Sequence, residues 1–490
     1  MKKVLILILF FQSITSVNAQ TQKGLTLQGQ DDGNWFGRSV SMPDSNTVAI
    51  GAPNNSTSAW HAGQVQIFSW NGNSWIQKGQ NLNGVASNNY FGQWVSMPDS
   101  NTIAIAAPYH DTNVTDSGEV SVFSWNGNAW VQKGMSINGT ETLDRLGWSI
   151  SMPDANTIAS GVPGPLAGYI KVHSWDGNSW LQKGQNIIGE NNPDGTGWAV
   201  SMPDSNTIAV SAHTATTYGS NGPNSSAGQV RIFSWNGSTW AQKGSNIDGQ
   251  SSGDHFGRSV SMPDANTIAI GAPNQDDNGN ISGQVKIFQW NGTSWSQKGL
   301  DINGDNESLS GWSVSMPNPN TVAIGAPINN TNGQYSGQTR VYIWDGINWV
   351  QNGIEINGDV NVGSGRSVSM PNTNTLAIGE PQQSGDGPGM VRIFENFPLL
   401  NSNEFDQSKN IIARLYPSPA KEVINIELRD KNIEINSIEL FDLKGVIINK
   451  FNALSANSNL SIDISSLQST TYIIKILTEE GIYYAKFIKH

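Results

Sequence analysis

The sequence predicts an all-β fold, and three observations support this prediction. A motif containing Ser-Met-Pro recurs seven times at spacings of 50–60 residues, with its Met at 42, 97, 152, 202, 262, 316 and 370. Each of the first six repeats holds four segments in which β-branched or aromatic residues alternate with polar ones, as expected of strands. The strong helix formers Lys, Glu and Leu are scarce, whereas Gly and Trp number 52 and 18. Seven units of four antiparallel strands predict a seven-bladed β-propeller, with an open β-solenoid as the alternative.

The four strands of a repeat can be followed in the first unit. They are "GRSVSMP" from 37, "NTVAIGAP" from 46, "GQVQIFSW" from 63 and "SWIQKGQNLNG" from 74, designated A to D. Strands A and B are joined by the short turn Pro-Asp-Ser-Asn. Strands C and D are joined by Trp-Asn-Gly or Trp-Asp-Gly, and Asn-Gly or Asp-Gly between alternating strands is the strongest short hairpin signal.

Tryptophans occur in pairs that flank each C–D turn. These pairs account for 12 of the 18 tryptophans: 70/75, 125/130, 175/180, 235/240, 290/295 and 344/349. A ring of stacking platforms for sugars is one interpretation. Packing of large aromatic surfaces within each blade is the other, and the strict periodicity favours it.

The two ends of the repeat region complement each other. The seventh repeat has strands A, B and C, then runs into Glu395-Asn396-Phe397-Pro398 without a strand D. The segment 21–29, "TQKGLTLQG", matches a strand D that lacks the other three. We therefore expect this N-terminal strand to complete blade seven and close the ring.

The flanking segments and the charge distribution indicate an exported protein. Residues 1–19 have two lysines, a short apolar core and the small-residue site Val17-Asn18-Ala19, which predict a cleaved signal peptide. The absence of Cys excludes disulfides and thiolate metal sites. Residues 21–408 hold 15 basic and 30 acidic residues, and this net charge of −15 argues against nucleic acid and anionic lipid as partners. No further segment is apolar enough to predict a transmembrane span.

A change in composition near residue 400 predicts a second domain. We expect the propeller over 20–397, a linker over 398–413 and a C-terminal domain over 414–490. Segments such as "VINIEL" and "TYIIKIL" alternate β-branched residues with short turns over about 80 residues. This pattern predicts a small β-sandwich.

The repeats resemble the FG-GAP family, which forms the seven-bladed propeller of integrin α subunits. Phe36-Gly37 with Gly51-Ala52-Pro53, and Phe256-Gly257 with Gly271-Ala272-Pro273, spell the motif, and the other repeats keep it in part. Many family members hold calcium in the A–B turn. Here that turn is too short to supply the 6–8 oxygens that calcium requires, so no cofactor is expected. The acidic loop at Asp276 and Asp277 is a weak cation candidate at a different place.

The C-terminal segment resembles the type A sorting domain of the type IX secretion system of Bacteroidetes. The residues that match are Tyr416, Pro417, Pro419, Asp442, Gly445, Lys486, Phe487 and Lys489. The resemblance implies that the secretion machinery is a partner. It also implies export through the periplasm to the outer-membrane surface or the medium, with cleavage of the domain outside.

The B–C loops vary most in length, from 4 to 14 residues, and they share one face with the D–A loops. Variable loops on a uniform scaffold favour ligand binding on that face, although unconstrained drift is the alternative. A second irregular column, four residues before each repeat Met, holds three Arg and three Trp that could grip an anionic or sugar ligand, or simply pack between blades. The candidate ligand-binding residues are Arg38, Trp60, Tyr109, Trp148, Trp198, Tyr218, Arg258, Trp312, Tyr335 and Arg366.

The sequence favours a non-catalytic binding or adhesion protein for an extracellular protein or glycan. A sialidase-like glycan-active enzyme is an alternative because three arginines in a propeller are typical of sialidases. However, "SWDGNSW" at 174–180 is one residue short of their Asp-box, and no nucleophile–base pair or catalytic carboxylate pair stands out. A structural surface-layer component is the third hypothesis.

Overall fold

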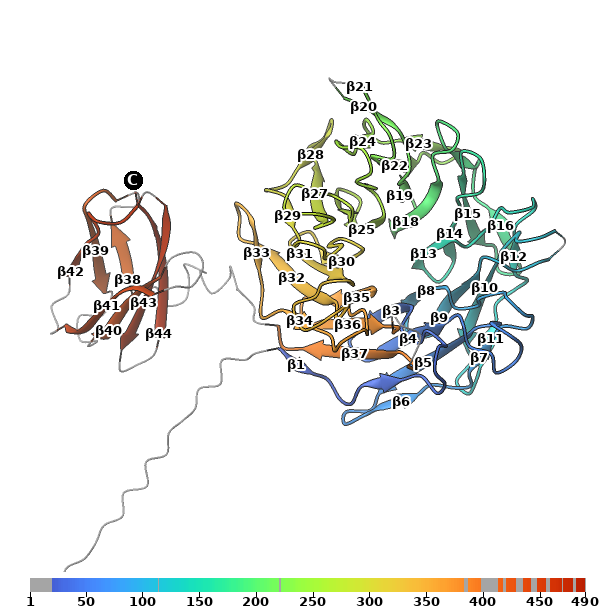
Figure 1. Ribbon diagram of the computed structural model, residues 1–490, viewed down its shortest axis with the longest axis horizontal. Helices are drawn as coiled ribbons and strands as arrows, with labels where there is room; N and C mark the ends of the chain where they lie inside the picture. Colours follow the sequence, from blue (N-terminus) through green and yellow to red (C-terminus); the bar gives the residue numbers. More distant parts are fainter. Residues whose placement is uncertain are drawn as a thin grey trace, which may run out of the picture. The chain divides into compact units, whose positions relative to one another are not determined.

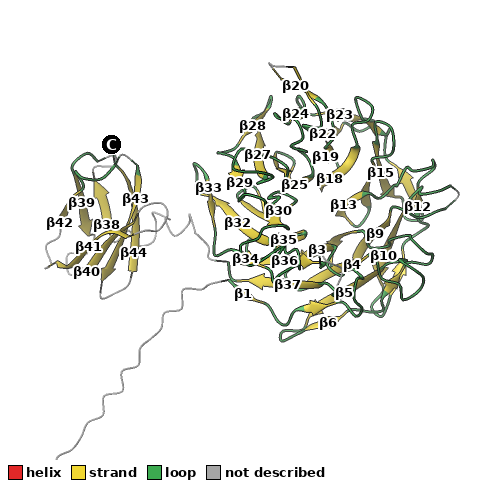
Figure 2. Ribbon diagram, viewed as in Figure 1, coloured by secondary structure: helices red, strands yellow, loops and turns green. Residues whose placement is uncertain are grey.

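The computed structural model describes residues 20–112, 114–219, 222–382, 387–397, 413–416, 420–428, 435–441, 447–454, 459–468, 470–478 and 482–489. The predicted signal peptide and most of the predicted linker lie outside these residues. The chain divides into two units, Met1–Leu400 and Asn401–His490. Every element in the described part is a strand (Figure 2), and within it no helix is long and apolar enough to span a membrane.

The first unit is a seven-bladed propeller, as predicted, with its blades arranged around a central axis (Figure 1). The innermost strands lie side by side around that axis and are β3 (Ser39–Asp44), β8 (Trp94–Asp99), β13 (Ser149–Asp154), β18 (Thr196–Asp204), β25 (Ser259–Asp264), β30 (Ser313–Asn318) and β35 (Ser367–Asn372). The second strands are β4 (Thr47–Ala52), β9 (Thr102–Ala107), β14 (Thr157–Val162), β19 (Thr207–Ala212), β26 (Thr267–Ala272), β31 (Thr321–Ala326) and β36 (Thr375–Glu380). All six residues of each second strand are buried because neighbouring blades cover both faces.

The third strands pair antiparallel with the second and are β5 (Gln64–Trp70), β10 (Glu119–Trp125), β15 (Tyr169–Trp175), β22 (Gln229–Trp235), β27 (Gln284–Trp290), β32 (Gln338–Trp344) and β37 (Met390–Glu395). The sequence predicts one outer strand D per blade, but the structure divides it. Each outer strand consists of two short strands that pair with the same third strand. The pairs are β6 (Trp75–Gln77) and β7 (Leu82–Asn83), β11 (Trp130–Gln132) and β12 (Ile137–Asn138), β16 (Trp180–Gln182) and β17 (Ile187–Ile188), β23 (Trp240–Gln242) and β24 (Ile247–Asp248), β28 (Trp295–Gln297) and β29 (Ile302–Asn303), and β33 (Trp349–Gln351) and β34 (Ile356–Asn357).

A Lys-Gly step interrupts each outer strand and joins one blade to the next. The Lys78 Nζ lies 5.3 and 5.4 Å from the ring centres of Trp125 and Trp130 in the following blade, and it donates a hydrogen bond to the Ser100 carbonyl at 2.6 Å. The Trp130 indole N–H donates to the Lys78 carbonyl in return, at 2.8 Å. Gly79 has a φ of +80°, and a Cβ there would lie 2.5 Å from the Trp125 ring. The same arrangement recurs at lysines 23, 133, 183, 243 and 298. The tryptophan pairs therefore pack the blades together.

The N-terminal segment completes blade seven, as predicted. Strands β1 (Thr21–Gln22) and β2 (Leu27–Gln28) both pair antiparallel with β37. The Lys23 side chain then crosses to blade one, where it bonds the Ser45 carbonyl at 2.9 Å, and its own carbonyl accepts the Trp75 indole N–H. The ring thus closes between the two ends of the repeat region.

The second unit consists of a three-stranded and a four-stranded sheet, in agreement with the predicted small β-sandwich. The first sheet holds β38 (Ala413–Tyr416), β39 (Val423–Leu428) and β42 (Asn459–Asp463). The second holds β40 (Ile435–Phe441), β41 (Ile447–Leu454), β43 (Thr471–Thr478) and β44 (Ile482–Ile488). Apolar residues from both sheets form one core, including Ile424, Ile426, Leu440 and Ile474. Of the sorting-motif residues, Tyr416 lies in β38, Lys486 and Phe487 lie in β44, and Lys489 is buried; Pro417, Pro419, Asp442 and Gly445 lie outside the described residues.

Candidate functional site

A tight turn before each inner strand fixes the column of arginines and tryptophans. The backbone N–H of Arg38 donates to the Trp35 carbonyl at 2.9 Å, and Arg258 does the same to His255 at 3.0 Å. The residue that accepts this bond adopts a left-handed backbone in every blade, at Trp35, Tyr90, Arg145, Gly195, His255, Leu309 and Gly363. Five of these seven residues carry large side chains, although only glycine adopts this backbone conformation without strain. Such backbone strain is common at functional sites.

The arginines and tryptophans of the column, together with Trp94, which follows the column position Gln93, form one cluster at the start of the inner strands. The Arg258 guanidinium carbon lies 4.0 Å from the ring centre of Trp312 and 5.1 Å from that of Trp198, while Arg366 lies 4.4 Å from Trp312. Arg38 lies 5.0 Å from the Trp94 ring, and the Trp148 and Trp198 rings are 5.0 Å apart. We call these residues the axial cluster: Arg38, Trp94, Trp148, Trp198, Arg258, Trp312 and Arg366.

A run of aromatic rings extends the axial cluster toward the B–C loops of blades one and two. Tyr109 contacts Trp148 at 6.1 Å between ring centres and Tyr90 at 5.1 Å. Tyr90 then contacts His61 at 5.6 Å, and His61 stacks on Trp60 at 4.3 Å. We call Trp60, His61, Tyr90 and Tyr109 the aromatic run. These contacts bring together loops that are distant in sequence.

Two histidines missed by the sequence analysis also adjoin the cluster. The His213 ring lies 3.8 Å from the Trp198 ring centre and 5.4 Å from that of His255. Burial, followed by the charge of Arg258, lowers the pKa of His213 to about 3 and also lowers the pKa of His255. Both imidazoles are therefore neutral at physiological pH.

The arginines of the axial cluster differ from the other described arginines of the propeller. Each of those four pairs with a carboxylate: Arg145 with Asp116, Arg231 with Glu190, Arg340 with Asp305, and Arg392 with Glu380. By contrast, within the described ranges no side-chain hydrogen bond or ion pair engages the guanidinium groups of Arg38, Arg258 or Arg366. Arg38 is nonetheless only 8% exposed. Unpaired buried charges of one sign are costly, so the cluster is suited to receiving an anion.

The pKa shifts of the three guanidiniums also indicate a cluster of positive charge that is suited to an anion. Burial lowers the pKa of Arg38 well below its usual value, and the charges of Arg366 and Arg258 lower it further. Burial, then the charge of Arg366, lowers the pKa of Arg258. These mutual effects indicate that three positive charges converge, and none of the described acidic side chains forms an ion pair with them.

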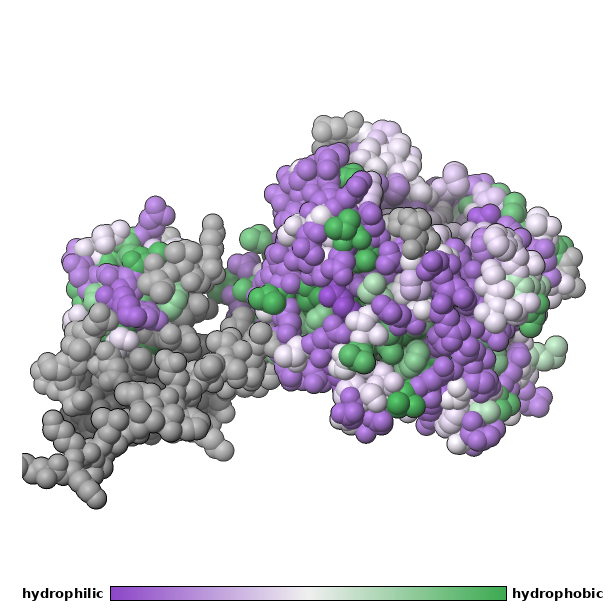
Figure 3. Space-filling model, turned by 60° about the horizontal axis from the view of Figure 1, so that its bottom comes forward, coloured by the Kyte–Doolittle hydropathy of each residue, from purple (hydrophilic) through white to green (hydrophobic). Residues whose placement is uncertain are grey.

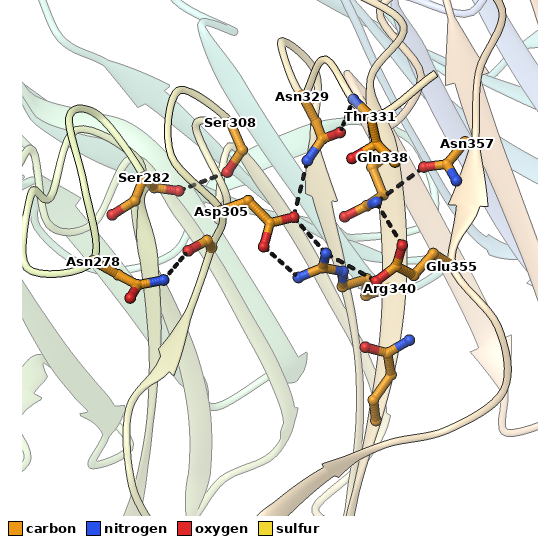
Figure 4. Close-up of polar contacts among 12 residues, drawn as sticks. Asn278, Ser282, Asp305, Ser308, Asn329, Thr331, Gln338, Arg340, Glu355 and Asn357 are labelled. Carbon is orange, nitrogen blue, oxygen red and sulfur yellow. Dashed lines mark hydrogen bonds and ion pairs between the residues drawn. The ribbon is translucent and has the colours of Figure 1, made fainter. Parts of the chain in front are cut away.

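Hydrogen bonds hold the B–C loops against the D–A loops, so both share the face on which the axial cluster opens. Figure 4 shows this for blades five and six: the Asn278 amide donates to the Gly304 carbonyl at 2.7 Å, and the Asn329 amide donates to Asp305 at 3.2 Å. Arg340 joins Asp305 to Glu355, the latter at 2.9 Å. The loops on this face are therefore anchored to the scaffold.

Three predicted candidates stand apart from the axial cluster and the aromatic run. Tyr218 lies in a small hairpin of β20 (Thr217–Gly219) and β21 (Gly222–Asn224) and is 82% exposed. Tyr335 is exposed at the end of a B–C loop, where its carbonyl accepts the Gly363 N–H at 3.0 Å. Asp276 caps its own loop by accepting the Ile281 N–H at 2.6 Å. No group of three acidic or histidine side chains suited to a metal occurs in the part of the chain that the structure describes.

The surface in Figure 3 offers no competing apolar docking area on the face that it shows. That face of the propeller is mostly hydrophilic, and its apolar side chains lie as separate spots. The axial cluster remains the strongest candidate site.

A pocket of about 220 Å³ between blades four and five holds a carboxyl group with a perturbed pKa. The pocket is lined by Asp254, Asp277, Lys286 and Trp295, among others. Burial, followed by the charge of Asp277, raises the pKa of Asp254 to about 6. Asn34 occupies the corresponding turn position in blade one, where its side-chain oxygen accepts the Phe36 N–H at 3.0 Å. An amide can therefore replace this carboxyl group in the turn.

We expect Asp254→Asn to stabilise the protein at pH 7.5 by about 1–2 kcal/mol and to give no gain at pH 4. Because the folded-state pKa is raised, the stabilising contribution of the protonated acid is complete below about pH 4 and is lost as the pH rises through about 6. Urea unfolding at both pH values measures the difference. Asp144→Asn is the matched control, because Asp144 accepts the Tyr169 hydroxyl at 2.8 Å and its replacement should destabilise at pH 7.5. Equal pH profiles for wild type and Asp254→Asn would contradict the prediction.

Comparison with known proteins agrees with both parts of the architecture. Residues 247–288 match the FG-GAP repeat, and residues 414–490 match the secretion system C-terminal sorting domain. The chain is thus an exported β-propeller protein. More particularly, it combines an FG-GAP-type propeller with a type IX sorting domain, which directs it to the outer-membrane surface or the extracellular space.

Two solved structures show a distant likeness, and no curated protein matches the chain. One is a proposed 6-phosphogluconolactonase from Bacteroides uniformis, at 11% identity, covering 66% of this chain and 86% of its own, with a TM-score of 0.46. The other is a protein from Lactobacillus plantarum, at 10% identity, covering 69% of this chain and 88% of its own, also with a TM-score of 0.46. Likeness at this level says nothing about activity.

Proposed function

We propose that this exported propeller is a non-catalytic binding protein that engages an extracellular protein or glycan through its B–C and D–A loop face. The observation that carries the proposal is the axial cluster, in which three arginines without a carboxylate partner among the described residues lie among tryptophan rings on that face. Arg and Trp are the residue types most enriched where binding energy concentrates. The aromatic run links this centre to the variable loops, so a ligand can contact both.

The chemistry around the cluster supports binding rather than catalysis. Glycoside hydrolysis generally needs a carboxylic acid and a second carboxylate or another nucleophile beside the scissile bond. The phenol of Tyr109 is the candidate nucleophile beside the cluster. Burial raises the pKa of this phenol, so its hydroxyl group stays protonated and is a weak nucleophile. Of the four carboxylates that pair with the propeller's other arginines, Asp116 is held beside the cluster by Arg145, whose guanidinium carbon lies 5.0 Å from the Tyr109 ring centre and 6.0 Å from that of Trp148. This carboxylate is engaged in an ion pair, and one carboxylate does not supply the pair that glycoside hydrolysis uses.

A loop exchange in the full-length protein tests the proposal. The B–C loop 54–62, which holds Trp60 and His61, is replaced by the four-residue loop 164–167, and binding to arrayed glycans and immobilised extracellular matrix proteins is measured. We expect binding by the wild type and a loss of roughly tenfold or more in the variant. Asn178→Lys is the control, because Asn178 is exposed in a C–D turn at the opposite end of its blade. Unchanged binding after the exchange, or processing of the glycan by the wild type, would overturn the proposal.

A further inference from the structure

We propose that the axial cluster binds the anionic group of an acidic glycan, with the adjoining sugar rings stacked along the aromatic run. This inference rests on the proposed function and specifies its ligand class. The side chains of the axial cluster carry three positive charges and no negative one. Arg38, Arg258 and Arg366 converge from blades one, five and seven, and within the described ranges they have no acidic partner. A carboxylate or sulfate at this place would supply the missing negative charge and accept several charge-assisted hydrogen bonds.

The site is asymmetric around the axis of the propeller. Two of the arginines come from blades five and seven, whereas the continuous aromatic contacts run through Trp198, Trp148, Tyr109 and Tyr90 in blades two to four and reach Trp60 in blade one. A small inorganic anion would use only the first half of this arrangement. A ligand with an acidic group at one end and apolar sugar faces at the other would use both, because aromatic rings stack on flat apolar faces.

Some polar groups in and beside the cluster lack a hydrogen-bond partner in the part of the chain that the structure describes. Among the described residues, the indole N–H groups of Trp148 and Trp94 and the Nδ1 of His213 are buried without a hydrogen-bond partner. Unsatisfied buried polar groups are rare and call for a specific explanation. Trp94 lies beside the Arg38 guanidinium, whereas Trp148 and His213 both contact Trp198, the ring over which Arg258 lies. A bound anion or a sugar hydroxyl would supply hydrogen-bond partners here after a small side-chain adjustment.

The negative charge of the protein favours a ligand that carries few negative charges. Residues 21–408, the propeller and part of the linker that follows it, carry a net charge of −15, so a polyanion such as DNA or heparin would be repelled by most of the surface. A glycan with one or few carboxylates avoids this repulsion and still satisfies the central arginines. An acidic peptide offers carboxylates too, but no flat apolar faces for the aromatic run.

Calorimetric titration of the full-length protein with matched probes tests the inference. The acidic sugar probes are sialyllactose and a glucuronic-acid disaccharide. Lactose is the uncharged control, and a tetraglutamate peptide is the control that carries carboxylates but no sugar ring. We expect both acidic sugars to bind and lactose to bind at least tenfold more weakly. Arg258→Gln and Arg366→Gln should each weaken acidic-sugar binding by roughly 10- to 100-fold, and Arg366→Lys should recover part of the loss. Lys171→Gln, which removes a charge from strand β15, should bind as the wild type does.

A folding defect is distinguished by the melting temperature. Arg38 contacts a single ring and is repelled by the other two arginines, so Arg38→Gln should melt no lower than the wild type while binding is lost. Lactose binding equal to that of the acidic sugars, Arg-dependent binding of tetraglutamate alone, or Arg variants that bind normally would overturn the inference. If matrix protein binds in a manner that depends on loop 54–62 but not on the arginines, the proposed function stands and this inference fails.

Discussion

Removing residues 20–29 is expected to lower the free energy of unfolding of the propeller by roughly 4–6 kcal/mol. The deletion removes β1 and β2, whose backbone groups pair with β37, at about 1 kcal/mol for each hydrogen bond. It also removes Lys23, whose N–H donates to the Ile393 carbonyl at 2.7 Å and whose side chain holds blade one. The edge of β37 is then left unpaired.

Urea unfolding of the deletion variant measures this loss. A synthetic peptide of residues 20–33, added in excess, should restore most of the stability, because it can rebuild the outer strand in trans. Leu25→Ser is the matched control: Leu25 is 86% exposed, so this change within the same segment should leave stability unaltered. A deletion variant that unfolds at the wild-type urea concentration would disprove the closure of the ring by this segment.

The fold could be predicted from the sequence because each blade repeats the same local rules. The C–D hairpin turns, the alternating strands and the missing outer strand of blade seven all follow from short-range patterns. The division of each outer strand could not be predicted, because it depends on Lys and Trp residues of neighbouring blades. Asn352 illustrates this: it takes the place of the repeated Lys in blade six, and the following blade has no tryptophan pair to receive a lysine.

The candidate site was only partly visible in the sequence. The column from Arg38 to Arg366 stood out because its residues vary within an otherwise regular repeat, and the structure places them in one cluster. Trp94, Tyr90, His213 and His255 were missed because they occupy other registers and approach the cluster only through the curvature of the ring. The left-handed turn residues were missed as well, since five of the seven are not glycine. Their position three residues before the column is the signal that could have revealed them.

The last prediction concerns export. Deleting residues 409–490 is expected to move most of the protein from the cell surface or medium to the periplasm, because the matched sorting domain occupies 414–490. A smaller truncation, of 482–490, should have the same effect, since it removes β44 and exposes the edge of β43, with which β44 pairs from Thr471↔Ile488 to Leu477↔Ile482. Immunoblots of fractionated cells measure the distribution.

Periplasmic retention of the truncated protein reports loss of the sorting signal only if the propeller stays folded there. Limited proteolysis of the retained protein should still give a resistant fragment, because the inner strands and the Lys–Trp contacts between blades lie entirely within residues 20–397. Glu422→Gln, a change at an exposed position of the sorting domain, is the control that should be exported normally. The domain should also be sufficient: residues 398–490 fused behind a periplasmic reporter should carry it to the surface. Normal surface display of the 409–490 deletion variant would show that the sorting signal lies elsewhere in the chain.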